Sequence, residues 1–223
     1  MDKKVIEIRG LSYCYPDGTK ALSDINLDVF EGESLGITGP NGAGKSTLLL
    51  HLNGVLRASS GSINILGREL SDENVAFIRG KVGVVFQEPD HQLFMPTVFD
   101  DVSFGPINMG MDKKETEARA RRALDEVDLG DYAKRPSHHL SYGEKRRVSI
   151  ATVLSMQPEI LVLDEPTSNL DPRHRKELIE FLQKTTITKV IASHDHDMVS
   201  QICKRTAAFE QGRLISLDLS LRQ

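Results

Sequence analysis

The sequence has 223 residues, of which 39% are hydrophobic and 27% charged, and its formal net charge is −4. This length allows one domain with a sizeable core, and the composition is typical of a globular protein. Proteins that bind duplex nucleic acid usually carry a clear basic excess, which this sequence lacks. The two cysteines, Cys14 and Cys203, form neither a Cys-x-x-Cys pair nor a disulfide framework, so we expect reduced thiols in a cytosolic protein.

The sequence also lacks the signals of a membrane-inserted chain. Residues Met1–Glu7 contain no apolar run like that of a signal peptide. No apolar stretch approaches the roughly 20 residues that a membrane helix needs. We therefore expect any association with a membrane to go through a partner.

Candidate strands and helices alternate along the first half of the chain. The turn signal Tyr15-Pro16-Asp17-Gly18 separates the first two strands. Alternation and β-branched residues predict strands at Val5–Ile8, Ile25–Val29, Ser34–Thr38, Ser62–Leu66 and Val82–Phe86, with a helix at Lys45–Asn53 that Gly54 stops. Residues 88–110, rich in Pro, Gly and Asp, predict loops with short helices.

The second half continues the same alternation. It predicts helices at Lys113–Val127, about Ser141–Ser155, Pro172–Leu182 and Asp197–Cys203, strands at Ile160–Leu163 and Lys189–Ala192, and a final hairpin of Ala207–Phe209 with Leu214–Ser216. The whole pattern indicates an α/β fold with a mainly parallel sheet. The largely helical interval predicts a helical subdomain at about residues 88–155, inserted into a core formed by about 1–87 and 156–223.

A glycine-rich segment between a strand and a helix matches the phosphate-loop pattern G-x-x-x-x-G-K-[ST]. It reads Gly39-Pro40-Asn41-Gly42-Ala43-Gly44-Lys45-Ser46-Thr47. Its glycines allow backbone N–H groups to curl around phosphates, and the helix that follows directs its positive end at the anion. Lys45 is expected to reach the β- and γ-phosphates, and Ser46 to bind Mg²⁺. The segment therefore predicts a site for MgATP.

The buried-strand run Ile160–Leu163 ends in two carboxylates, Asp164 and Glu165. Parallel α/β sheets bind ligands at the carboxyl ends of their strands. Downstream of a phosphate loop, Asp164 is suited to bind Mg²⁺, directly or through water. Glu165 is suited to act as the general base, or to orient the attacking water.

Four further motifs follow in order along the chain. Gln87 closes the strand Val82–Phe86, Leu140-Ser141-Tyr142-Gly143-Glu144 precedes a helix, Ser168-Asn169-Leu170-Asp171 follows Glu165, and His194 follows the strand Lys189–Ala192. Together with the phosphate loop, these motifs closely resemble those of the ATP-binding-cassette (ABC) ATPases over nearly the whole chain. The resemblance implies a phosphate-loop NTPase core of mainly parallel sheet with an N-terminal antiparallel β subdomain and an inserted helical subdomain.

The resemblance also implies a role for each motif. Gln87 is similar to the Q-loop glutamine, which contacts Mg²⁺ and senses a partner subunit, and His194 to the switch histidine that holds the γ-phosphate. Residues Leu140–Glu144 resemble the signature motif, and Ser168–Asp171 resemble the D-loop, whose Asp171 belongs to the nucleotide site. Tyr15 resembles the aromatic residue that stacks on adenine, and Tyr13 is the other candidate.

The signature segment is also interpretable from its residues. Ser141-x-x-Glu144 is a capping-box pattern, and the helix start beside Gly143 offers N–H donors to an anion. In the family, that anion is the γ-phosphate bound by the opposite subunit, so each ATP lies between two chains. The sequence departs from the common form Leu-Ser-Gly-Gly-Gln at Tyr142 and Glu144.

Two polar clusters allow other interpretations. Ser193-His194-Asp195-His196-Asp197 could hold a metal, although a switch histidine followed by a solvated helix start is favoured. The run Lys145-Arg146-Arg147 is expected to be a solvated face of the signature helix, because nucleic-acid binding needs a wider basic patch.

The segments Gln87–Phe94, Thr97–Pro106 and Tyr13–Thr19 are similar to those of the ATPase subunits of energy-coupling-factor importers, which move cobalt, nickel or vitamins. This resemblance implies a homodimer, or a heterodimer with a homologous ATPase, bound to integral membrane subunits at the cytoplasmic face of the membrane. Nucleic acid is not expected as a partner. A different class of ABC transporter is one alternative. A soluble cassette ATPase acting on DNA or the ribosome is the other, but such proteins usually carry a long coiled coil or two cassettes. An ATP-binding module without turnover is disfavoured by the presence of Glu165 and His194.

Overall fold

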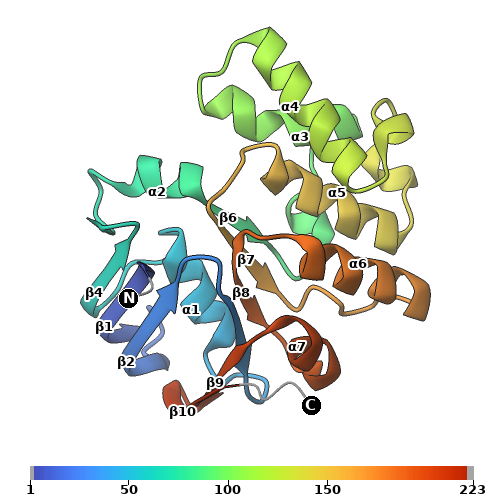
Figure 1. The fold of residues 1–223 in the computed structure, drawn as a ribbon. Coiled ribbons are helices and arrows are strands. Elements are labelled where there is room, and N and C mark those ends of the chain that lie inside the picture. The colour runs from blue at the N-terminus through green and yellow to red at the C-terminus, as the bar shows by residue number, and fades with distance from the viewer. Residues whose placement is uncertain (1–2, 220–223) are drawn as a thin grey trace.

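Two β-sheets organise the chain in the computed structural model, which describes residues 3–219 (Figure 1). The smaller sheet is antiparallel and has the strand order β2-β1-β4-β5. Its strands are β1 (Lys4–Cys14), β2 (Lys20–Phe30), β4 (Ser60–Ile65) and β5 (Arg68–Glu69). Strands β1 and β2 are far longer than predicted. A bulge at Gly10, whose φ is +60°, lets β1 continue past the break in its alternation and pair with the whole of β2.

The larger sheet has the strand order β10-β9-β3-β8-β7-β6. It consists of β3 (Ser34–Thr38), β6 (Val82–Val85), β7 (Ile160–Asp164), β8 (Thr188–Ala192), β9 (Arg205–Glu210) and β10 (Arg213–Leu219). All its neighbouring strands are parallel except the hairpin β9–β10. Ala192 is paired with both Ile37 and Asp164, so the carboxyl ends of three central strands lie at one edge.

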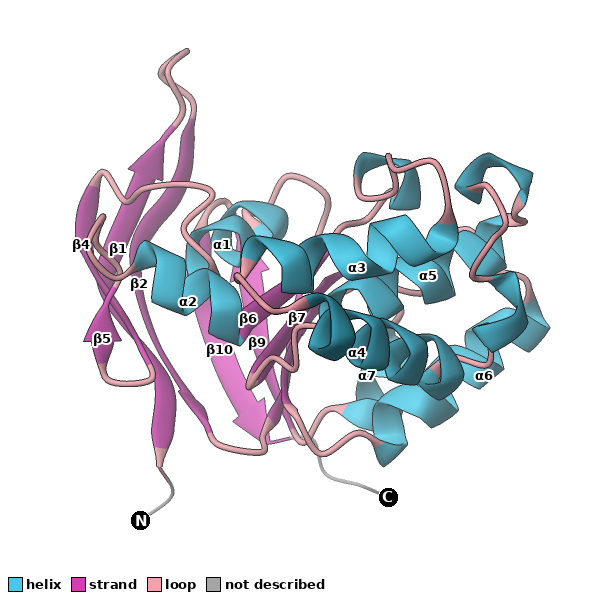
Figure 2. Cartoon of the chain, turned by 90° about the horizontal axis from the view of Figure 1, so that it is seen from above, coloured by secondary structure: helices cyan, strands magenta, loops and turns pink. Residues whose placement is uncertain are grey.

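Within residues 3–219, seven α-helices pack around these sheets (Figures 1 and 2). They are α1 (Lys45–Leu52), α2 (Val75–Lys81), α3 (Val98–Asn108), α4 (Lys113–Glu126), α5 (Tyr142–Leu154), α6 (Pro172–Lys184) and α7 (His196–Ile202). Helices α3, α4 and α5 pack on one another and form one apolar core with the outer face of the parallel sheet. No helix within residues 3–219 combines the length and apolar character of a membrane span.

Two helices differ from the prediction. Helix α2 was not predicted, and α3 was predicted only as part of a loop region with short helices. Helix α3 contains Gly105 and Pro106, which normally interrupt helices, but Thr97 caps its start by accepting a hydrogen bond from the Asp100 N–H. A Cβ at Gly105 would lie 2.6 Å from Met156 Cγ, so tertiary packing requires the glycine inside the helix.

The mixed α/β fold, with one antiparallel and one mostly parallel sheet, confirms the predicted fold class. It matters for function because the phosphate loop follows β3, the acidic pair ends β7 and the histidine segment follows β8. Neighbouring parallel strands therefore bring three segments that are far apart in the sequence to the same edge of the sheet.

Candidate functional site

A cavity of about 580 Å³ opens at the carboxyl edge of the parallel sheet. Its walls come from the turn after β1, the phosphate loop, the segment after β6, the end of β7 and the segment after β8. The lining residues are Tyr15, Thr19, Lys20, Ala21, Asn41, Gly42, Gly44, Lys45, Ser46, Thr47, Gln87, Glu165 and His194. Ten of the sequence-predicted site residues therefore meet in one cavity. Thr19, Lys20 and Ala21 were not predicted, although they directly follow the predicted turn.

The phosphate loop has a backbone that only glycine fits at two positions. Gly39 has a φ of +142°, and a Cβ there would lie 2.1 Å from the Phe209 carbonyl oxygen. Gly44, with a φ of +100°, begins helix α1, and its Cβ would lie 2.6 Å from the Ala21 oxygen. The loop is thereby folded tightly against neighbouring backbone. Asn41, Gly42 and Gly44 line the cavity beside the start of α1, where an anion site is expected.

Lys45 and Ser46 begin helix α1 at the base of the cavity. Lys45 is 6% exposed, and its ammonium donates to the carbonyl oxygens of Gly39 (2.8 Å) and Pro40 (3.1 Å). Gly39, Pro40 and Ala43 do not line the cavity; they shape the loop from behind. Among the described residues, the hydrogen bonds of this buried ammonium go to neutral carbonyls. It is well suited to an anionic ligand, because a phosphate oxygen is a stronger acceptor than a carbonyl.

Of the two candidate aromatic residues, Tyr15 lies in the cavity wall and Tyr13 does not. The Tyr15 hydroxyl is 2.9 Å from Thr47 Oγ1, which anchors the side chain to helix α1. Tyr13 packs edge-on against Tyr15 and against the buried His51, with ring centroids 5.0 Å and 4.8 Å away. Tyr13 therefore supports Tyr15 from the core side.

Asp164 ends strand β7 beside the phosphate loop. Burial raises the pKa of its carboxyl group, and neighbouring Ser46 and Lys45 oppose that shift. Its Oδ1 is buried and has no hydrogen-bond partner within the described part of the chain. An orphaned carboxylate oxygen next to a serine hydroxyl fits Mg²⁺, which prefers hard oxygen ligands and binds through few protein groups plus phosphates. The residues present therefore fit MgATP.

Glu165 follows directly and is almost fully buried, with 7% exposed. Its φ of +44° lies in the left-handed region, which is uncommon for a residue other than glycine and typical of functional sites. Its carboxylate accepts hydrogen bonds from the Ser193 hydroxyl (2.9 Å) and the His194 N–H (3.1 Å). His194 Nδ1 lies 2.8 Å from Glu165 Oε2. Glu165 and His194 thus face each other across the cavity edge, and Ser193, which was not predicted, holds the carboxylate.

Gln87 also reaches this cavity, from the segment after β6. Its backbone is held by an unexpected residue, Arg146 of helix α5, whose guanidinium donates to the carbonyl oxygens of Phe86 and Gln87. The prediction that Lys145, Arg146 and Arg147 form a solvated face is wrong for Arg146, which is 0% exposed. Helix α5 directs this side chain inward. The sequence does not reveal this, because Arg146 lies between two other basic residues.

Ser141, Gly143 and Asp171 do not line the cavity of their own chain. Ser141 begins α5 with the predicted capping box: its Oγ accepts from the Glu144 N–H (3.3 Å), and its own N–H donates to Glu144 (2.7 Å). A Cβ at Gly143 would lie 2.7 Å from the His174 ring. Asp171 caps helix α6 and bonds the same His174. These three residues therefore form a second cluster, separate from the phosphate loop.

The segment Ser193–Asp197 does not form a metal site. Among the described residues, no group of three or more His, Cys, Asp or Glu side chains is placed to hold a metal. Instead, Arg175 donates twice to Asp195, at 2.8 Å, and once to Asp197, at 2.7 Å. This pairing lowers the pKa of Asp195 to about 2 and fixes the segment that carries His194.

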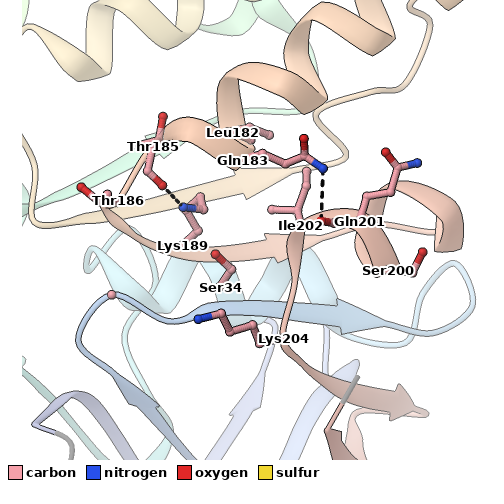
Figure 3. Close-up of a pocket in the computed structure, with 11 residues that line it drawn as sticks. Ser34, Leu182, Gln183, Thr185, Thr186, Lys189, Ser200, Gln201, Ile202 and Lys204 are labelled. Atoms are coloured by element: carbon pink, nitrogen blue, oxygen red, sulfur yellow. Dashed lines mark hydrogen bonds between the residues drawn. The ribbon is translucent and has the colours of Figure 1, made fainter. Parts of the chain in front are cut away.

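A larger cavity of about 1050 Å³ lies at the opposite, amino-terminal edge of the sheet (Figure 3). Its most notable side chain is Lys189, which donates to the carbonyl oxygens of Thr185 (2.6 Å) and Ile187 (3.1 Å). Burial lowers the pKa of Lys189. Since the lysine satisfies carbonyls after the end of α6, its role there is structural, and the cavity brings together none of the predicted catalytic residues.

Comparison with known proteins agrees with the geometry. Residues 22–168 match the family model described as ABC transporter. The chain is 50% identical over 214 residues to an ABC transporter ATP-binding protein of Geobacter sulfurreducens, covering 96% of this chain and 86% of that protein. It is 49% identical over 217 residues to the energy-coupling factor transporter ATP-binding protein EcfA of Methanothermobacter thermautotrophicus, covering 95% and 70%.

Two solved structures have the same fold. CbiO1 of Clostridium perfringens, part of the ABC transporter complex CbiONQ, superposes with a TM-score of 0.88 at 39% identity, covering 98% of this chain and 90% of that one. A dimeric ATP-binding cassette in a post-hydrolysis state with ADP and Pi superposes with a TM-score of 0.87 at 27% identity, covering 98% and 100%. The chain belongs to the ABC transporter family and is an ATP-binding cassette ATPase.

Proposed function

We propose that two cassettes bind and hydrolyse MgATP between them, and that each nucleotide site combines the cavity of one chain with the Ser141 cluster of the other. Within one chain, Lys45 and Ser141 belong to separate clusters, and Ser141 does not line the cavity that contains Lys45. A two-fold pair places each signature helix opposite a phosphate loop and so forms two equivalent sites. The partner is a second copy of this chain or a homologous ATPase.

In this proposal, each group of cavity residues binds a different part of MgATP. Tyr15 stacks on the adenine ring, and the loop Gly39–Thr47 holds the phosphates through its N–H groups and Lys45. Ser46, Asp164 and Gln87 hold Mg²⁺, which neutralises the charge of the phosphate oxygens when it is bound. Ser141 and Gly143 of the opposite chain cover the γ-phosphate with the start of helix α5, and Asp171 contributes to the same interface.

Hydrolysis depends on Glu165 and His194. Glu165 accepts a proton from the attacking water, or orients that water in line with the γ-phosphate. The Ser193 hydroxyl holds Oε2 of this carboxylate and the His194 N–H holds Oε1, so the orientation of a residue that lines the cavity is fixed. His194 lies at the cavity edge, where its ring can contact the γ-phosphate. The chemistry is therefore dominated by positioning and charge stabilisation.

An apolar groove suits the attachment of a membrane partner. Residues 88–155 form a helical subdomain in this proposal, and residues 1–87 and 156–223 form the core. A groove of about 980 Å³ lies between helix α2 of the core and helix α3 of the subdomain. Its apolar lining comes from Phe77, Phe104, Met109, Met111 and Met156, and the basic residues Arg79, Lys81 and Arg119 also line it. Phe94, Phe104, Ile107 and Met109 are all more than 40% exposed, and such clustered apolar side chains mark interaction sites.

We therefore propose that the chain is the ATPase subunit of an importer of the energy-coupling-factor type. The groove between α2 and α3 carries this proposal, together with the similarity to EcfA and CbiO1. A short helix of an integral membrane subunit would occupy the groove, so that closure of the ATPase pair moves that subunit. The imported substrate would be cobalt, nickel or a vitamin, and the chain would lie at the cytoplasmic face of the membrane.

Co-purification with membrane subunits tests this proposal. A tagged chain extracted from detergent-solubilised membranes is expected to bring integral membrane proteins with it, and Ile107→Asp in the exposed cluster is expected to abolish their recovery. Ile215→Asp is the matched control, because Ile215 is as exposed (58% against 60%) but lies on β10, away from the groove. Equal recovery of membrane subunits with both variants would contradict docking in the groove, and recovery of ribosomes or DNA instead would contradict the importer proposal.

A further inference from the structure

Arg146 is the largest fully buried side chain described in the structure. It lies on the second turn of helix α5, the helix that begins with the signature residues. Its hydrogen-bond acceptors in the described part of the chain are two carbonyl oxygens and a hydroxyl, and none is a carboxylate. Burying a guanidinium without a directly bonded counter-charge is unfavourable, and burial lowers the pKa of this group. Because burying this side chain costs free energy, we expect it to have a role other than packing.

The contacts of Arg146 all point to one place. One terminal nitrogen donates to the Phe86 carbonyl oxygen at 2.6 Å, and the other donates to the Gln87 carbonyl oxygen and to the Tyr142 hydroxyl, at 3.2 Å from the latter. Phe86 follows strand β6, and Gln87 is the residue that enters the nucleotide cavity. The guanidinium fork therefore ties the backbone on both sides of this junction to helix α5.

Gln92 adds a second tie to the same helix. Its side-chain oxygen accepts a hydrogen bond from the Phe86 N–H (3.2 Å). Its amide nitrogen donates to the Ser149 carbonyl oxygen (2.8 Å) and to Thr152 Oγ1 (2.7 Å). Both backbone polar groups of Phe86 are thereby connected to α5. The strand end, the Gln87 backbone and the signature helix are held as one unit.

Tyr142 completes the arrangement. It stands where the common signature has glycine, and its hydroxyl approaches the Gln87 carbonyl oxygen (3.4 Å) and the Glu88 carboxylate (3.5 Å). The side chain thus turns back toward the Gln87 segment of its own chain. Tyr142, which replaces the glycine of the common motif, therefore contacts the Gln87 segment.

We propose that Arg146, with Tyr142, is a positioning residue that sets Gln87 relative to the signature helix. Gln87 serves the ATP bound by its own chain, whereas Ser141 serves the ATP bound by the partner, so the Arg146 tie connects the two sites of the dimer. The inference rests on the proposed roles of Gln87 and Ser141. Arginine is needed because its planar fork reaches two carbonyl oxygens at once, which a lysine ammonium on a flexible stem does not reproduce.

A double-mutant cycle on basal ATP hydrolysis tests the inference. Arg146→Met in the otherwise natural chain is expected to lower kcat about tenfold or more, as loss of a supporting contact behind a metal-site residue does. The affinity for ATP is expected to stay within about twofold, and the Mg²⁺ concentration for half-maximal rate is expected to rise. In a Gln87→Ala background, Arg146→Met should lower kcat less than about twofold, because residues that act through each other are not additive.

Two further variants keep the test clear of folding defects. Arg146→Lys keeps the charge but loses the fork, and is expected to show the same non-additivity with a smaller loss. Lys145→Met is the matched control, since Lys145 is the preceding residue on α5 and its ammonium, within residues 3–219, pairs with the exposed Asp90 alone (2.7 Å). Its kcat and Mg²⁺ requirement are expected to be unchanged within about twofold, because a surface ion pair contributes little.

The outcomes distinguish a failure of the positioning role of Arg146 from a failure of the proposed role of Gln87. If Gln87→Ala lowers the rate but Arg146→Met and Arg146→Lys lower it by the same factors in both backgrounds, the positioning role is wrong and the role of Gln87 stands. If Gln87→Ala alone leaves rate and Mg²⁺ requirement unchanged, the proposed role of Gln87 fails and the inference fails with it. Basal hydrolysis needs no membrane subunit, so neither result depends on the importer proposal.

Discussion

Glu165 Oε2 lies 2.8 Å from His194 Nδ1, and the same oxygen accepts a hydrogen bond from Ser193 at 2.9 Å. The end of strand β7 and the segment after β8 are therefore joined at the point where the γ-phosphate is expected. The contact follows from strand pairing, because Asp164 and Ala192 are partners in the sheet. It places a carboxylate and an imidazole where they can act on one phosphate.

Glu165→Gln is expected to abolish turnover while preserving binding. The amide is isosteric but does not accept a proton, and general-base catalysis contributes typically about 10²–10⁴-fold to a rate. Phosphate release should fall by at least that lower factor, and a fluorescent ATP analogue should bind with unchanged affinity. Undiminished phosphate release would rule out the role of Glu165.

Lys45→Ala is expected to weaken ATP binding rather than turnover alone. A charge-assisted hydrogen bond contributes about 1.5–3 kcal/mol, which corresponds to roughly a 10- to 150-fold loss of affinity. Isothermal titration with ATP measures this loss, and thermal melting of the variant checks that the loop still folds. Normal ATP affinity in a folded variant would contradict the phosphate-loop interpretation.

Ser193→Ala is expected to lower kcat about tenfold, because the Glu165 carboxylate loses the hydroxyl that orients it. Ser193→Thr retains the hydroxyl and is the matched control. The KM for ATP should change little in either variant, since Ser193 does not line the nucleotide cavity. Steady-state kinetics of both variants give the answer, and equal losses in the two would show that the hydroxyl is not responsible.

Tyr15→Ala is expected to raise the KM for ATP, because stacking of a base on an aromatic ring contributes about 1–3 kcal/mol, or roughly 5- to 150-fold. Tyr15→Phe keeps the ring but removes the hydroxyl that meets Thr47 Oγ1. A KM close to that of the natural chain is therefore expected for Tyr15→Phe. If alanine and phenylalanine behave alike, the ring does not stack on adenine.

The Arg175–Asp195 pair predicts a pH-dependent contribution to stability. Because Arg175 lowers the pKa of Asp195 from 3.8 to about 2, the carboxylate stabilises the fold fully above pH 4, and this contribution is lost as pH falls through about 2. Asp195→Asn should destabilise the chain by about 1.5–3 kcal/mol at pH 7. Urea unfolding of both proteins should show the difference narrowing between pH 4 and pH 2; a difference independent of pH would contradict the assignment.

The sequence predicts the parts of this fold that follow from local chemistry. The phosphate loop, the acidic end of β7 and the capping box at Ser141 each combine residue types and spacings that few structures other than the observed ones satisfy. Their assembly at one sheet edge was also predictable, because parallel strands share that edge.

Other features depend on tertiary packing and were missed. Helix α3 forms despite Gly105 and Pro106, because the backbone packs against Met156. Arg146 was assigned to the surface because its neighbours are charged, and only the orientation of α5 against β6 reveals its burial. The hydroxyl of Ser193 had no signal beyond its place before His194. The sequence does not show which of Tyr13 and Tyr15 lies in the nucleotide cavity. The structure does, because the Tyr13 ring packs against the buried His51 and Tyr15 lines the cavity.

The proposal that each site needs two chains can be tested by mixing two inactive variants. Lys45→Ala damages the phosphate loop and Ser141→Arg damages the signature helix, so each variant alone should hydrolyse almost no ATP. In a mixed dimer, one site has both halves intact. At equal concentrations, random pairing makes half of the dimers mixed with one of two sites working, so phosphate release should recover to about a quarter of the natural rate. A mixture that stays as inactive as either variant alone would contradict the composite site.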